Sequence, residues 1–436
     1  MDADSPSQAT PATAPAKAST ASAHGEATSA AVPAGGPTER SSSAASAHGE
    51  ATSAADREAM PGGAAPAAGG EGFSGRPRAA EQGSASNGNS DDTVLATSVV
   101  GSYSVPEWLE RLKTDFYQRR ISGQYLEDIH EVAIKAALKD QETAGVDIVS
   151  DGELRRDNDI DYFLARMPGI EIPHVAKTFY YDYYDAYVRH PIPVDDESAT
   201  LGLVDDLKFT LQYTQKPVKF SFTGPFSLAR RVHNEAYASL DDLVMAFARV
   251  LNREARALAL AGAAVLQIDE PFLAGYPEEV GVAVRAINQV YEGVSGPTRA
   301  VHVCYGNRYA RPVWEGHYEF LFPAILDAQV DQLVLEFARK GYDDLDLFKK
   351  YSSRTLALGL GVIDVKNPAP EPPGLIAARV RQALQVLPPD RLMINPDCGL
   401  RHVPADAARA KLQAMSAGAA IVRAEVLGKS TTSIEA

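Results

Sequence analysis

The sequence contains two cysteines, and each lies where it could act together with a histidine and a glutamate. His302 and Cys304 are separated by one residue at the end of an apolar run, while Glu336 and Cys398 follow two later runs. Alternate residues of a strand face the same side, so His302 and Cys304 can point toward one site. Imidazole, thiolate and carboxylate are the ligand types of zinc. The spacing fits a four-ligand zinc site, or two buried reduced cysteines beside a hydrogen-bonded histidine.

Other polar side chains also stand directly after apolar runs. They are Ser102, Glu153, Asp269 and Asp364. A carboxylate at such a position can simply cap the following helix. So many ionisable groups at the ends of separate runs favour a binding or catalytic site over capping alone.

The elements that must position these residues are short apolar runs separated by longer amphipathic stretches. We predict strands at Leu95–Val100, Val146–Ser150, Val218–Phe222, Val265–Ile268, Ala300–Cys304, Gln332–Phe337, Leu356–Val362 and Leu392–Ile394, and helices at Leu126–Ala144, Leu240–Ala261, Glu278–Tyr291 and Leu375–Val386. Alternation of this kind indicates parallel pairing, because each parallel connection needs a crossover. Eight repeats predict an α/β fold, a closed (β/α)₈ TIM barrel over residues 94–436, with the functional side chains at the carboxyl ends of the strands. The alternative, a doubly wound open sheet, lacks a G-x-G-x-x-G motif after the first strand.

The connection between the second and third predicted strands is rich in aromatic residues. Phe179, Tyr180, Tyr181, Tyr183, Tyr184 and Tyr187 all lie in it. We expect a hydrophobic cluster packed over the barrel. The alternative is a wall of the substrate cleft, which long connections of this fold often provide.

Residues 1–93 differ in composition from the rest of the chain. They contain no Leu, Ile, Tyr, Trp or Cys, and they repeat ASAHGEATSAA at 21–31 and 45–55. Side chains so poor in apolar surface cannot offset the entropy of ordering, so we expect a disordered tail. The tail has neither the apolar stretch of a signal peptide nor the Arg-rich, acid-poor composition of a transit peptide, which predicts a cytoplasmic protein. The net charge of −15 and the absence of a long apolar run argue against nucleic acid and membrane as partners.

Seven motifs of the predicted barrel resemble the catalytic half of the cobalamin-independent methionine synthase family. They are VVGSY (99–103), DGELRRDNDIDYF (151–163), LQIDEP (266–271), AVHVCYGN (300–307), LVLEF (333–337), GVIDVK (361–366) and INPDCGL (394–400). The resemblance implies that His302, Cys304, Glu336 and Cys398 bind zinc. It also implies that Glu153 and Asp269 bind the amino group of homocysteine, and that Ser102 lies in the segment holding its carboxylate.

The implied reaction is a methyl transfer to homocysteine. Two thiolates and one carboxylate carry −3 against +2 for zinc, and such an electron-rich metal should leave a coordinated substrate thiolate nucleophilic. We therefore expect the homocysteine sulfur to bind zinc and attack a methyl group in a direct displacement. Four protein ligands leave no vacancy for the substrate sulfur. We expect Glu336, the single oxygen ligand, to be the one whose bond to zinc loosens.

Two segments depart from the folate-dependent members of the family. The segment after the third strand reads FSFTGPFSLARR (220–231), without the family's tryptophan, and Asp364-Val365-Lys366 replaces an Asp-x-His that is a candidate proton donor. These departures resemble the short, single-barrel branch, which implies a corrinoid methyl-donor protein as a candidate partner in place of methyltetrahydrofolate. Asp364 is the candidate catalytic residue, though it could also hold the donor or cap a helix. We expect Lys366 to be a solvated charge at the rim.

Two other functions fit the same residues. One is alkyl transfer to another thiol, such as coenzyme M in an epoxide-opening branch, although two carboxylates would repel a sulfonate. The other is a zinc-stabilised binding barrel without turnover. Such a barrel would not require the acidic residues Glu153, Asp269 and Asp364.

Overall fold

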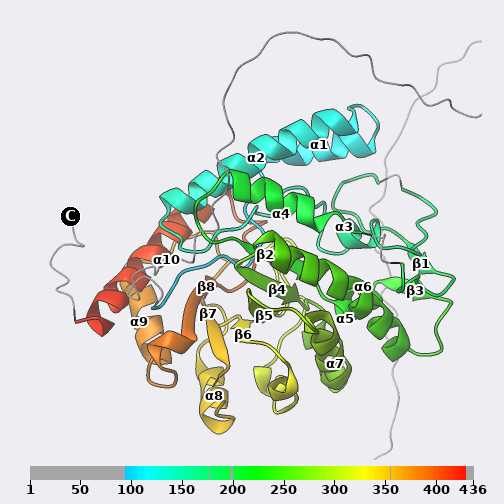
Figure 1. Cartoon of the computed structure of the whole chain (residues 1–436). Coiled ribbons are helices and arrows are strands. Elements are labelled where there is room, and N and C mark those ends of the chain that lie inside the picture. The colour runs from blue at the N-terminus through cyan, green and yellow to red at the C-terminus, as the bar shows by residue number, and fades with distance from the viewer. Residues whose placement is uncertain (1–93, 176, 197–199, 354, 429–436) are drawn as a thin grey trace, which may run out of the picture. The chain divides into compact units, whose positions relative to one another are not determined.

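A computed structural model describes residues 94–428 except 176, 197–199 and 354. The tail expected at residues 1–93 lies outside the described residues. Within them, six parallel strands form one sheet in the order β2-β4-β5-β6-β7-β8 (Figure 1). Their bounds are β2 Lys219–Thr223, β4 Val265–Asp269, β5 Thr298–Val303, β6 Gln332–Leu335, β7 Ala357–Ile363 and β8 Leu392–Pro396.

Two short segments close this sheet into a barrel. Thr97 bridges Ile394 of β8, Ser98 bridges Ile148, and Val149 bridges Val218 beside β2, all in parallel. The segments at 97–98 and 148–149 thus stand where the first two strands were predicted. They are single bridges rather than full strands, and Leu95 has a left-handed φ of 52° that interrupts extended backbone. The predicted (β/α)₈ barrel is confirmed.

Helices surround the strands on the outside (Figure 1). Their bounds are α1 Glu107–Tyr117, α2 Gly123–Thr143, α3 Asp161–Leu164, α4 Leu203–Gln212, α5 Pro225–Ala229, α6 Leu240–Ala261, α7 Val280–Tyr291, α8 Asp346–Lys350, α9 Pro373–Ala383 and α10 Ala405–Val426. The bounds of α6 match the prediction because both ends carry signals. Ser239 accepts a hydrogen bond from the Asp242 N–H, and Gly262 ends the helix at a φ of 104°.

A small two-stranded sheet lies outside the barrel and was not predicted. Its strands are β1 Ala186–Val188 and β3 Val232–Asn234, which pair in parallel. Three-residue strands carry too short an alternation of polar and apolar residues to be read from sequence. The sheet ties the aromatic-rich connection to the segment that follows α5.

The interior of the barrel contains a buried ammonium group. Lys219 is 1% exposed, and its Nζ donates to the Val99 carbonyl at 2.8 Å and to Asn395 Oδ1 at 3.5 Å. Burial lowers the pKa of Lys219 from 10.5 to about 7, against the opposing effect of the Asp269 charge.

This buried lysine predicts a pH-dependent stability. Between pH 7 and about 10 the unfolded chain binds the proton that the folded chain releases, so the free energy of unfolding rises with pH by up to about 1.4 kcal/mol per unit. Below pH 7 both states are protonated, so the slope vanishes and the destabilising effect of the buried ammonium is fully present. Urea denaturation at pH 7.5, 8.5 and 9.5 should show the slope in the wild type and its loss in Lys219→Met. Parallel pH profiles of the two proteins would contradict the assignment.

No helix in the described part of the chain has both the length and the apolarity needed to cross a bilayer.

Candidate metal centre and substrate site

Three predicted metal ligands converge at the carboxyl ends of strands. The ligand atoms of His302 in β5, Cys304 just after it and Cys398 after β8 all lie within 4.8 Å of one another. The two Sγ atoms are 3.5 Å apart and form no disulfide. Because β5 and β8 are not neighbours in the sheet, the barrel brings these residues together across its mouth.

The histidine ring is oriented with one nitrogen free. Its Nδ1 lies 3.0 Å from the Val334 carbonyl oxygen, which can only accept a hydrogen bond. In the neutral ring the proton is therefore on Nδ1, and Nε2 carries the lone pair. This Nε2 is buried and lacks a hydrogen-bond partner in the described part of the chain. A hydrogen bond that fixes one ring nitrogen while the other stays free is the usual arrangement of a metal-binding histidine.

The two thiols lie close enough to share one cation. The neighbouring Cys304 sulfur and burial together raise the pKa of Cys398 well above its usual value. Two thiolates this close repel each other, so both can be ionised only if a positive charge lies between them. Together with the free His302 Nε2, the donor set fits zinc.

Glu336 lies apart from this group of three ligand atoms. Its side chain is fully buried after β6, where Oε1 accepts from Arg339 at 2.7 Å and Oε2 from Lys366 Nζ at 2.9 Å. Glu336 as a fourth ligand stays a prediction. The expectation for Lys366 was wrong, since its side chain is 5% exposed and forms a buried ion pair rather than a solvated charge. Burial alone would lower the pKa of Lys366, but the paired Glu336 carboxylate opposes it and the pKa is raised.

Glu153 is held in a tight turn after the second barrel segment. Its φ is 57°, a left-handed conformation that costs a non-glycine residue about 1 kcal/mol, and its N–H donates to Asp151 Oδ1 at 2.8 Å. The Oε1 atom accepts from Ser221 at 2.7 Å and pairs with Arg156 at 3.0 Å. A Cβ on Gly101 would lie 2.2 Å from this oxygen, so a glycine is required there.

Asp269 ends β4 beside the metal ligands. Its Cα is the register partner of His302 across β4 and β5, and its Oδ1 accepts from Gln267 at 2.7 Å. Burial raises the pKa of Asp269 to about 7; the His302 charge opposes this and the Glu153 charge adds to it. The register places Asp269 beside His302, and the Ser221 hydrogen bond ties Glu153 to β2, the strand next to β4.

Ser102 and Asp364 both follow barrel strands, but they make different contacts. Ser102 packs against Gly399, where a Cβ would lie 1.9 Å from its Oγ, and its carbonyl accepts from Leu400 N–H at 2.8 Å. Ser102 is therefore directly beside the segment that carries Cys398. Asp364 Oδ1 accepts from the Lys366 N–H at 2.8 Å, so this carboxylate shapes its own turn.

Two supporting residues were not among the predicted site residues. Asp397 is fully buried and accepts from the N–H groups of Phe337 at 3.0 Å, Ala338 at 2.8 Å and Arg339 at 2.9 Å, which fixes the loop after β6. Arg156 connects Glu153 to the Ser221 carbonyl. Both lie in the motifs that carry the family resemblance, so that signal could have identified them.

The aromatic-rich connection contributes to a cavity near the same rim. Tyr181 and Tyr183 line a space of about 190 Å³ together with Asp159, Arg231 and residues that follow β4 and β5 (Pro271, Phe272, Gly306, Asn307, Arg308, Val313 and Trp314). Tyr180 instead is 1% exposed and donates to Glu110 at 3.0 Å. Both alternatives for this connection are thus represented: part packs inward and part lines a cleft.

The barrel part of this chain matches known proteins over nearly their whole length. The catalytic-domain model of the cobalamin-independent synthase family matches residues 95–420. A methionine synthase of Thermococcus kodakarensis is 35% identical over 347 residues, which cover 78% of this chain and 97% of that protein. One from Saccharolobus solfataricus is 34% identical over 339 residues, covering 77% and 97%.

Solved structures of methionine synthases also match this chain. A B12-independent methionine synthase from a Shewanella species, determined in complex with selenomethionine, is 28% identical with a TM-score of 0.66, and the match covers 77% of this chain and 99% of that one. A protein from Listeria monocytogenes described as a vitamin-B12-independent methionine synthase has a TM-score of 0.60 at 21% identity, over 74% of this chain and 96% of that one, and supports the fold alone.

Proposed function

This chain belongs to the cobalamin-independent methionine synthase family, and we propose that it transfers a methyl group to the thiol of homocysteine and forms methionine. The observation that carries the proposal is the convergence of His302, Cys304 and Cys398, with a free imidazole nitrogen and two unbridged sulfurs. The reduced cysteine pair also supports a reducing compartment such as the cytoplasm.

We infer that the metal is zinc and that these three residues hold it, with Glu336 as the proposed fourth ligand. Zinc bound there would supply Lewis acidity that lowers the pKa of a substrate thiol and keeps it as a thiolate near neutral pH. The ion pairs of Glu336 with Lys366 and Arg339 give this carboxylate a cationic environment that would hold it in place whether or not it binds the metal. Lys366 and Arg339 would then be positioning residues for Glu336.

Glu153 and Asp269 are proposed to bind the substrate ammonium group. Glu153 is 8% exposed and Asp269 is half-buried beside His302, and low exposure to water strengthens the attraction of a carboxylate for a cation. Ser102, beside the Cys398 segment, is proposed to contact the substrate carboxylate. The same pair of acids disfavours a sulfonate such as coenzyme M.

The chemical step is a displacement at carbon. The homocysteine sulfur forms the new bond to the methyl carbon as the bond from that carbon to the donor breaks, and the donor leaves with the electron pair. The protein residues orient the sulfur through the bound ammonium and carboxylate groups. Asp364 is the proposed group on the donor side, since its carboxylate lies at the end of β7.

We propose that the methyl donor reaches the site through the cleft lined by Tyr181, Tyr183 and Trp314. Two donors are considered, methyltetrahydrofolate and a methylcobalamin-bearing protein. The match to the archaeal relatives over 97% of their length supports a single-barrel enzyme.

The test is an assay of the zinc-loaded chain with homocysteine and each donor in parallel. We expect methionine to form with one of them, and methylcobalamin can be supplied free or on a corrinoid protein. Failure with both donors, combined with tight zinc binding, would instead favour the zinc-stabilised barrel without turnover. Alkylation of coenzyme M in preference to homocysteine would favour the epoxide-opening alternative.

A further inference from the structure

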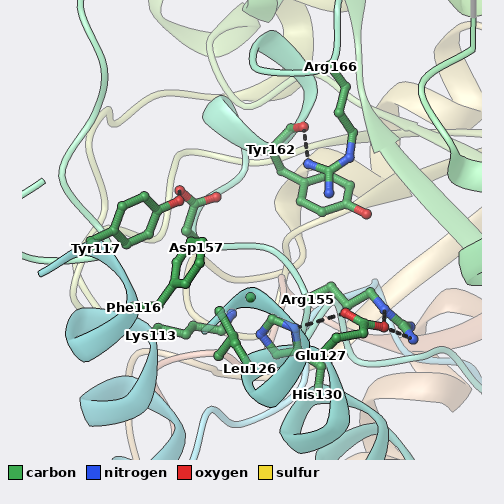
Figure 2. A pocket seen from close by; sticks show the side chains of 11 residues that line it. Lys113, Phe116, Tyr117, Leu126, Glu127, His130, Arg155, Asp157, Tyr162 and Arg166 are labelled. Atoms are coloured by element: carbon green, nitrogen blue, oxygen red, sulfur yellow. Dashed lines mark hydrogen bonds and ion pairs between the residues drawn. The ribbon is translucent and has the colours of Figure 1, made fainter. Parts of the chain in front are cut away.

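A second cavity lies away from the metal centre and shares no residue with it. It lies among α1, α2 and the segment from Arg155 to Arg166, and its volume is about 200 Å³ (Figure 2). Its lining is Lys113, Phe116, Tyr117, Gly123, Leu126, Glu127, His130, Arg155, Asp157, Tyr162 and Arg166. Most of these side chains are charged or polar, which is unusual for a cavity that merely reflects imperfect packing.

Each carboxylate of the lining already has a cationic partner. Glu127 pairs with Arg155 at 2.7 Å and lies 3.4 Å from His130 Nδ1. Asp157 pairs with Lys177 at 2.5 Å and accepts from Tyr117 at 2.8 Å. The negative charge of the cavity wall is therefore fully compensated.

Two cations of the lining have no such partner among the described residues. Lys113 is 2% exposed, and its Nζ donates to the Arg156 carbonyl at 2.6 Å, but no carboxylate oxygen lies within 4.0 Å of it. Arg166 stacks on the Tyr162 ring at 3.7 Å and donates to the Tyr162 carbonyl at 2.9 Å, again without an ion pair. A buried ammonium that lacks a counter-ion is costly, and burial lowers the pKa of Lys113 well below its usual value. An anion bound beside Nζ would favour the charged form of this side chain.

Two buried nitrogen atoms of the lining also lack hydrogen-bond partners. They are Arg155 Nη1, which can only donate, and His130 Nε2. Because His130 Nδ1 faces the Glu127 carboxylate, its proton belongs on Nδ1 and Nε2 can accept. Burial lowers the pKa of His130 to about 4, so the ring is neutral at pH 7. The cavity thus offers unfilled donors, the Arg166 charge and one acceptor.

We propose that this cavity binds a small oxyanion that also carries a hydroxyl group, a phosphate or a hydroxycarboxylate. The anionic oxygens would take the Arg155 Nη1 and Lys113 donors, with Arg166 at the rim. The hydroxyl would donate to His130 Nε2. Figure 2 shows the Lys113 and His130 side chains directed toward the same part of the cavity.

Isothermal titration of the full zinc-loaded chain with inorganic phosphate and, separately, with malate tests this proposal. Sodium chloride at matched ionic strength is the reference. We expect saturable binding of at least one oxyanion, and the two titrations distinguish a phosphate from a carboxylate ligand. Homocysteine is absent, so the outcome is independent of methyl transfer.

Arg166→Gln is the main variant, because this side chain is exposed at the rim and its loss should leave the fold intact. Affinity should fall about tenfold, the effect of losing one charge-assisted contact. Lys113→Met should weaken binding further. Arg111→Gln is the matched control, since Arg111 lies on α1 in an exposed pair with Glu107 outside the cavity. Absence of saturable binding in the wild type, or equal affinity in Arg166→Gln and the wild type, would overturn the proposal.

Discussion

Replacing Cys398 with serine is expected to remove zinc and reduce methionine formation by at least about 100-fold, a larger loss than that caused by perturbing a residue behind the ligands. A serine hydroxyl stays protonated near neutral pH and is a poor zinc ligand. The substitution changes little volume, so the barrel should remain folded. Metal content after dialysis against a chelator and the rate of methyl transfer measure the two effects.

The control for this variant is the wild-type chain stripped of its metal. Because ligand binding stabilises the folded state, metal-free wild type and Cys398→Ser should unfold at similar temperatures, both below the zinc-loaded wild type. A variant that retains one zinc per chain and a rate within tenfold of wild type would show that Cys398 is not a ligand.

Asp269→Asn is expected to raise the KM for homocysteine about 10- to 100-fold with a smaller change in kcat. Loss of one charged hydrogen bond to the substrate ammonium costs about 1.5–3 kcal/mol, which corresponds to this range. 4-Mercaptobutyrate, which lacks the amino group, sharpens the measurement. The wild type should prefer homocysteine strongly, and the variant should lose most of that preference.

The matched control for Asp269→Asn is Asp241→Asn, which removes a carboxylate from the outside of the barrel. Asp241 is half-exposed in an ion pair with Arg285, and pairs of this kind contribute little. Its kinetic constants should equal those of the wild type. If Asp269→Asn leaves both KM and the preference over 4-mercaptobutyrate unchanged, Asp269 does not bind the ammonium group.

The barrel could be predicted because its signals are local. Strand β7 is a continuous apolar run, and α6 carries both a serine cap and a terminal glycine. The extent of the first two strands was predicted to be too long. Apolar content at 95–100 and 146–150 does not reveal that each segment makes only isolated bridges. Strands β1 and β3 were missed because three residues give no periodicity.

The site was predictable to the extent that residue type determines it. The His302, Cys304 and Cys398 convergence follows from the ends of parallel strands meeting at one rim. The environment of Lys366 was not predictable, since its ion pair joins residues from the loops after β6 and β7. The three N–H groups held by Asp397 likewise depend on tertiary contacts with no sequence periodicity.

Zinc-edge X-ray absorption of the purified chain, with and without homocysteine, tests the central claim most directly. We predict stoichiometric zinc with one imidazole nitrogen and two sulfurs from the protein in its shell, and a third sulfur after homocysteine is added. A chain that purifies and reconstitutes without zinc, or a sulfur count that homocysteine leaves unchanged, would contradict the account.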